Sequence, residues 1–128
     1  MFIRFVSGEI DDDSNLPMGL FRCRYLLKQV SLLAYEQAAL DELFQWFNKN
    51  LESPYDYRLR PRHRAERSIC WFRSTAREHL ARAWEIVSIM EEHDIYIRCV
   101  KFREVGQILY EDKVQVLAFP DRELRRKL

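Results

Sequence analysis

Residues 75–102 read TAREHLARAWEIVSIMEEHDIYIRCVKF, and they contain the most informative pattern for the fold. Its apolar residues first recur at helical spacing, and from Tyr96 onward apolar and polar residues alternate. A change of period from about 3.6 to about 2 predicts an amphipathic helix followed by a strand. Thr75 and Glu78 have the spacing of a capping box, which predicts that the helix starts there.

The apolar face of this helix is wider than usual, because Ile86, Ile89 and Met90 extend the main stripe. A wide face packs against more than one neighbour, for instance a sheet and a second helix. A second copy of the chain is another way to cover it, so a homodimeric structural subunit is one alternative.

In the strand that follows, Tyr96, Val100 and Phe102 are expected on one face, with Ile97 and Cys99 on the other. The same two periods predict further elements on either side. They are a strand over 2–6, a short helix over 18–29 introduced by Pro17, a helix over 33–50, an irregular segment over 52–68, a strand or extended plug over 69–72, and strands over 107–110 and 114–119 joined by residues 111–113.

These elements predict an α+β fold: an N-terminal strand, two to three helices, and C-terminal antiparallel strands forming a three-stranded meander. The strands are expected to form one sheet with the helices packed on it. The chain has 128 residues, of which 48% are hydrophobic, so one domain over 1–120 with a charged tail over 121–128 is expected.

Composition excludes several classes of protein. Lys and Arg number 21 against 20 Asp and Glu, so nucleic-acid binding would need local clustering of charge. Cys23, Cys70 and Cys99 are too few and too widely spaced for a disulfide framework or a metal site, which predicts free thiols in the cytoplasm. Three glycines make no phosphate-binding loop, so no cofactor is expected, and no apolar run is long enough to suggest a membrane partner.

Several short motifs resemble those of a family of small bacterial proteins that have no assigned function. They are ICWFR at 69–73, GQILYED at 106–112 with Gln115-Val116 after it, GLFR at 19–22, and WFN at 46–48. The resemblance covers most of the chain. It implies a single bacterial cytoplasmic domain, and it implies no catalytic or binding residue.

Arginines gather in the segment before and after Pro61, interleaved with Tyr55, Tyr57 and Trp71. A guanidinium binds phosphate or carboxylate through a planar fork, so the cluster predicts an anion-binding segment. The alternative is that these side chains are solvated or pair with the acidic loop at 11–13 and with glutamates on the helices. The candidate anion-binding residues are Arg60, Arg62, Arg64, Arg67 and Arg73.

Cys70 is a candidate catalytic residue, because it lies between Arg67 and Arg73 and shortly before a helix. Cations and a helix N-terminus favour the thiolate, and His79 is a possible general base. The neighbours of Cys70 are apolar, however, so a buried structural cysteine is the competing interpretation.

Glu111 and Asp112 form the third candidate, beside Tyr110 at a strand end. Paired carboxylates perform acid and base chemistry when they converge. Adjacent strand residues point to opposite faces, so convergence would require the turn to bend them together.

The expected function is therefore that of a small cytoplasmic, non-enzymatic binding or regulatory module with an arginine-rich anion-binding segment. Its partner would be an anionic ligand, an acidic protein surface or, less directly, nucleic acid. The alternatives are a small enzyme that acts on an anionic substrate through Cys70 or the Glu111 and Asp112 carboxylates, and the homodimeric subunit.

Overall fold

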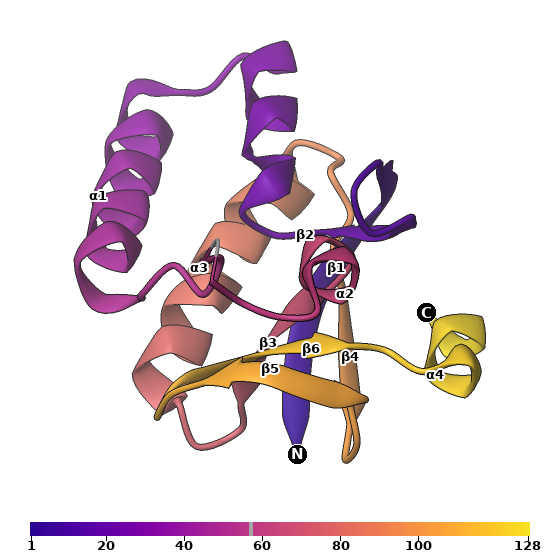
Figure 1. Cartoon of the computed structure of the whole chain (residues 1–128). Helices are drawn as coiled ribbons and strands as arrows, with labels where there is room; N and C mark the ends of the chain where they lie inside the picture. Colours follow the sequence, from indigo (N-terminus) through magenta and orange to yellow (C-terminus); the bar gives the residue numbers. More distant parts are fainter. Residues whose placement is uncertain (57) are drawn as a thin grey trace.

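The computed structural model describes residues 1–56 and 58–128, so Tyr57, one of the aromatic residues expected among the arginines, lies outside the described residues. Figure 1 shows the longer helices on one side of a sheet and the C-terminal helix apart from them. In chain order the elements are β1 (Phe2–Asp11), β2 (Leu16–Gly19), the 3-10 helix η1 (Arg22–Gln29), α1 (Ala34–Asn50), α2 (Arg62–Glu66), β3 (Ile69–Arg73), α3 (Arg77–Glu92), β4 (Arg98–Phe102), β5 (Gln107–Glu111), β6 (Gln115–Phe119) and α4 (Arg122–Lys127).

Strand β1 is the hub of a six-stranded antiparallel sheet, which confirms the predicted α+β class. One edge of β1 pairs with β4 from Phe2 to Val6. The opposite edge pairs with two strands in succession, first β3 at Phe2 and Ile3 and then β2 from Val6 onward. Beyond β3 the order continues to β6 and β5.

The predicted C-terminal meander is wrong, because β4 pairs with β1 and not with β5. Residues 103–106 lead the chain away from β4, and β5 then pairs only with β6 among the described strands. In this register Phe2 faces Phe102 and Phe5 faces Cys99, so β4 continues both apolar faces of β1. The pairing of β4 with β1 therefore follows from the match between their apolar faces. Proximity of β4 to β5 in the sequence does not determine it.

The two faces of the sheet bury different clusters. Phe5 and Phe72 belong to the larger cluster, under η1, α1 and α3. Trp71 and Val116 belong to a smaller cluster on the other face, to which Leu124 of α4 contributes. The predicted faces agree for four of the five residues, since Ile97 and Cys99 join the larger cluster and Val100 and Phe102 join the smaller one. Tyr96, expected on the face of Val100, lies before β4 and is 71% exposed.

The wide apolar face of α3 is largely covered within the chain. Ile86, Val87 and Met90 are buried in the larger cluster. Trp84 remains 46% exposed, and its ring packs edge-on against Phe5 with centroids 5.0 Å apart. Packing within one chain therefore covers most of the wide apolar face of α3, which had suggested a homodimer.

The predicted helix over 33–50 is confirmed by α1, and the predicted strand over 69–72 by β3. The helix expected over 18–29 is wrong in its first residues, because Pro17 lies in β2 and the helical segment η1 starts at Arg22. The segment over 52–68, expected to be irregular, contains the short helix α2.

The capping box expected at Thr75 is also absent from the start of α3, whose N-cap is Ala76 with no side-chain hydrogen bond. Glu78 instead pairs with Arg82 one turn along the helix. A carboxylate does cap α1, where the Leu33 amide donates to Glu36 Oε1 at 2.9 Å. Glu36 also meets His93 Nε2 at 3.0 Å, so it ties the start of α1 to the end of α3.

The predicted C-terminal tail forms helix α4. The Leu124 amide donates to Asp121 Oδ1 at 2.8 Å, and the Leu124 side chain is 6% exposed. Within residues 1–56 and 58–128, no helix has both the length and the apolar character needed to cross a bilayer.

Candidate functional site

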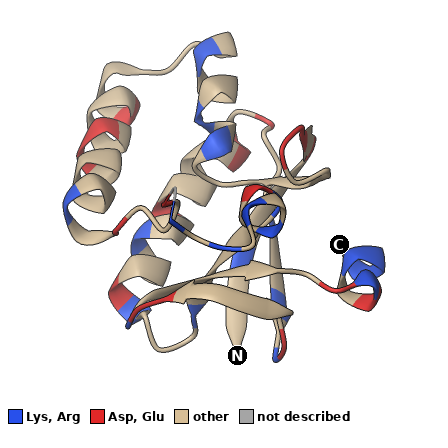
Figure 2. Cartoon of the chain, in the orientation of Figure 1, with Lys and Arg blue, Asp and Glu red and all other residues tan. Residues whose placement is uncertain are grey.

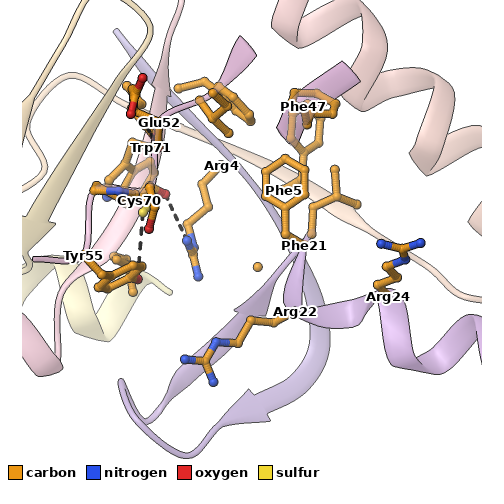
Figure 3. A pocket seen from close by; sticks show the side chains of 18 of the residues that line it. Arg4, Phe5, Phe21, Arg22, Arg24, Phe47, Glu52, Tyr55, Cys70 and Trp71 are labelled. Atoms are coloured by element: carbon orange, nitrogen blue, oxygen red, sulfur yellow. Dashed lines mark hydrogen bonds between the residues drawn. The ribbon is translucent and has the colours of Figure 1, made fainter. Parts of the chain in front are cut away.

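The sheet is open at a fork where β2 and β3 diverge along the same edge of β1. Arg4 and Phe5 lie between the last residue of β1 that pairs with β3 and the first that pairs with β2. A cavity of about 360 Å³ occupies this place and extends to the chain after α1 (Figure 3). We call it the fork cavity and define it by the lining residues Arg4, Phe21, Arg22, Arg24, Tyr55 and Cys70.

Arg4 is the central polar group of the fork cavity. Its guanidinium crosses the fork, donating to the Cys70 carbonyl at 2.9 Å and, over a longer 3.4 Å contact, to the Pro17 carbonyl. A guanidinium carries five N–H donors, so these two carbonyls leave most of its donors available. Among the described residues, no carboxylate lies within ion-pair distance of Arg4, and burial lowers the pKa of this guanidinium.

Gly19, at the end of β2, makes room for this side chain. A Cβ at Gly19 would lie 3.0 Å from the Arg4 Nη2 atom and 3.2 Å from Cζ. Those distances are tighter than ordinary van der Waals contact, so a larger residue would displace the guanidinium. The absence of a side chain at this position therefore helps to place Arg4 across the fork.

One wall of the fork cavity is aromatic. Phe21 is 39% exposed and packs edge-on against Phe47, with ring centroids 4.9 Å apart, and against Phe44 at 6.5 Å. The Arg24 guanidinium lies over the Phe44 ring, 4.2 Å from its centroid. Figure 3 shows Phe21 and Phe47 across the cavity from Cys70 and Tyr55, with Arg4 between them. The cavity therefore combines a flat apolar wall with cationic groups.

Arg22 lines both the fork cavity and a second cavity of about 480 Å³, as do Asp11 and Tyr55. It pairs with Asp11 at 3.2 Å and with Asp13 at 2.7 Å, and its hydrogen bond to Asp13 raises the pKa of the guanidinium. The acidic loop thus pairs with Arg22 of η1. The alternative pairing of this loop with the 60–73 arginines is not seen among the ion pairs of the described residues.

Cys70 lines the fork cavity from β3, but its surroundings disfavour the thiolate. Its Sγ lies 3.8 Å from Tyr55 Oη, and burial raises the pKa of the Cys70 thiol. His79, the possible base, lies 2.7 Å from the Asn50 carbonyl through Nε2 and packs against the Trp46 ring at 4.7 Å. No hydrogen bond joins His79 to Cys70 in the described part of the chain.

Glu111 and Asp112 line neither cavity. Asp112 shapes the β5–β6 turn, where its Oδ1 accepts from the amides of Val114 at 2.8 Å and Gln115 at 2.9 Å. Burial raises the pKa of the Asp112 carboxyl, but these bonds and one from Tyr110 outweigh burial, so the pKa lies below its usual range. Glu111 extends instead to Arg73, at 3.7 Å.

The five arginines predicted to bind an anion do not gather at one point. Arg62 and Arg67 line the second cavity, and Arg64 lies over the Phe119 ring, 5.3 Å from its centroid. Arg60 donates to the Leu59 carbonyl. Arg73 lies at the far end of β3, where it donates to the Asp112 carbonyl at 2.7 Å.

Trp71 also lines the fork cavity, and it is 1% exposed. Its indole Nε1 is buried with no hydrogen-bond partner among the described residues. Buried polar groups nearly always have a hydrogen-bond partner, so an unpaired indole N–H is unusual.

Sequence reasoning missed Arg4, Arg22 and Arg24, the three cations of the fork cavity. Arg4 is a single arginine in an apolar strand. A charged residue in such a strand was the only feature of the sequence that could have indicated its role. The pairing of β1 with strands from distant parts of the chain makes this residue a site.

Comparison of the chain with models of known protein families matched none of them, and searches of curated proteins and of solved structures found no similar chain. The resemblance to a bacterial family therefore gains no support from these comparisons.

Proposed function

We propose that this protein is a non-enzymatic binding module whose fork cavity holds a small anionic ligand with an aromatic or other flat apolar part. The observation that carries the proposal is Arg4, a cation in the cavity that donates to two carbonyls and has no carboxylate of the described residues within ion-pair distance. Water solvates an exposed guanidinium, but a half-buried one such as that of Arg4 gains more from an anionic partner. A carboxylate or phosphate of the ligand would supply it.

The rest of the cavity supports both parts of this ligand. Arg24 is held over Phe44 and adds a second cation, while Phe21 offers a partly exposed ring for stacking. Asp11 and Glu52 also line the cavity, but Asp11 already accepts from Arg22 and Ser14. The protonated Cys70 and the turn-bound Asp112 give no comparable support to the enzyme alternative.

Phenyl phosphate is a suitable probe because it carries both features. We expect it to bind more tightly than inorganic phosphate or phenol in calorimetric titration, since only phenyl phosphate engages the cations and the aromatic wall together. In two-dimensional NMR, the largest shifts should fall on the backbone amides of Gly19 and Cys70, which line the cavity on either side of Arg4. These positions test the site in the unmodified protein.

The matched variants are Arg4→Lys, Arg24→Gln and Arg103→Gln. Arg4→Lys keeps the charge but cannot span both carbonyls, and we expect it to weaken binding about tenfold, which corresponds to about 1.4 kcal/mol. Arg24→Gln should weaken binding by less, because Arg24 is half exposed. Arg103 is exposed between β4 and β5 and should have no effect. Unchanged affinity in Arg4→Lys, or shifts that map elsewhere, would refute the proposal.

A further inference from the structure

Two basic segments from different thirds of the chain meet at one aromatic ring. Phe119 ends β6, and Arg64 of α2 lies over its ring, 5.3 Å from the centroid. Arg125 of α4 lies 5.5 Å from the same centroid. Figure 2 shows the blue of α2 and of α4 on either side of the end of β6. We call residues 58–67 and 122–127 together the basic ridge.

The basic ridge concentrates the positive charge of the molecule. It holds nine of the 21 basic side chains and two of the 20 acidic ones, which gives it a net charge of +7. The rest of the chain then carries −6, since the total is +1. The near-neutral total therefore includes a local excess of positive charge in these two segments, and such an excess attracts polyanions. Asp11, Asp12, Asp13 and Asp56 line the second cavity beside Arg62 and Arg67, so the excess is offset at that end of the ridge.

The ridge is held in place by bonds to the rest of the fold. Arg64 donates to the side chain of Gln107 at the start of β5. Arg125 donates to the Ser14 carbonyl at 3.2 Å, and the buried Leu124 anchors α4. Arg64 and Arg125 are therefore held before a partner binds, and a held side chain loses less conformational entropy on binding than a free one.

Several cations of the ridge are exposed and available to a partner. Arg67, Arg122 and Arg126 are exposed, and in the described part of the chain no carboxylate lies within 4.0 Å of them. Among the described residues, the ion pairs of Arg62 with Glu66 at 3.8 Å and of Lys127 with Glu123 at 3.6 Å are long and exposed. Arg62 also donates to the Asp56 carbonyl at 3.0 Å. Such ion pairs contribute little, so they compete weakly with a ligand.

We infer that the basic ridge binds the phosphate backbone of single-stranded nucleic acid. Eight of its nine basic residues are arginine, whose planar fork matches phosphate geometry. Duplex readers commonly insert a helix into the major groove, but α2 has five residues and α4 has six. Cations beside an aromatic ring are typical of surfaces that follow a single strand.

The test is fluorescence anisotropy with a labelled thymidine oligomer of about 20 nucleotides, repeated over a series of salt concentrations. We expect binding at about 50 mM salt, with an affinity that falls linearly on logarithmic axes as salt rises. The triple variant Arg62→Gln, Arg67→Gln, Arg126→Gln should weaken binding at least about tenfold and make the salt slope shallower.

The control variant removes the same charge elsewhere, by Arg98→Gln, Lys101→Gln and Arg103→Gln at β4, all of them exposed. It should bind within about twofold of the unmodified protein. Equal losses in both variants would show an effect of net charge alone and overturn the inference. So would absence of binding, tighter binding of a duplex of equal length, or equally tight binding of poly-glutamate, which would indicate an acidic protein partner.

Discussion

Gly106 and Gly8 differ in what surrounds them. Gly106 has a φ of 92°, and a Cβ built there would overlap the Phe119 carbonyl oxygen. Gly8 lies in β1, and a Cβ there would have no atom within 4 Å. Only Gly106 is therefore required by the backbone and by the close approach of β6.

We predict that Gly106→Ala lowers the free energy of unfolding by about 2 kcal/mol or more, because the left-handed backbone and the overlap both oppose the methyl group. Gly8→Ala should change it by less than about 0.5 kcal/mol. Urea unfolding followed by circular dichroism measures both. A smaller loss in Gly106→Ala than in Gly8→Ala would contradict the turn described here.

At the scale of elements, the helix starts depend on particular side chains. Asp121 accepts the Leu124 amide and caps α4, whereas Thr75 makes no side-chain cap at α3. Asp121→Ala should therefore lower the free energy of unfolding by about 1 kcal/mol. Thr75→Ala is the control and should have an effect below about 0.5 kcal/mol. Thermal unfolding of both variants tests this, and a larger effect at Thr75 would favour the capping box expected from the sequence.

Elements with a long periodic pattern were predictable from the sequence. The stripe of Leu40, Leu43 and Phe47 places α1, and the alternation from Ile97 to Phe102 gives the two faces of β4. The prediction from Pro17 was wrong, because proline suits two positions. It fits the first turn of a helix, and it also fits an edge strand such as β2, where a backbone amide needs no partner strand. Thr75 and Glu78 have capping-box spacing, but the helix starts at Arg77 and Glu78 pairs with Arg82.

At the scale of the whole molecule, β1 has neighbours on both sides. Phe2 and Ile3 each pair with β3 on one side and β4 on the other, while β5 has one partner among the described strands. We predict that the amides of Phe2, Ile3 and Val6, which have a strand on both sides, exchange with solvent more slowly than those of β5. Hydrogen exchange followed by NMR measures this. Greater protection in β5 than in β1 would contradict the strand order.

The candidate site depends on this strand order, which is why sequence reasoning placed it elsewhere. Arg4 lies in an ordinary apolar strand, and it becomes a cavity residue because β2 and β3 leave a gap on the same edge of β1. The arginine segment was visible in the sequence, but its proximity to α4 depends on the end of β6. Local patterns carry no information about such long-range pairing.

The position of β1 in the sheet also constrains the order in which the fold assembles. β1 leaves the ribosome before β4, and residues 12–97 lie between them. Until those residues have been synthesised, β1 can pair only with β2 and then β3, and its other edge is exposed. While residues 12–97 are being synthesised, the nascent chain therefore carries an apolar strand edge, which is the kind of surface that chaperones bind. The fork at Arg4 has both of its strands once β2 and β3 have paired with β1. At that stage the opposite edge of β1, which pairs with β4, is still exposed.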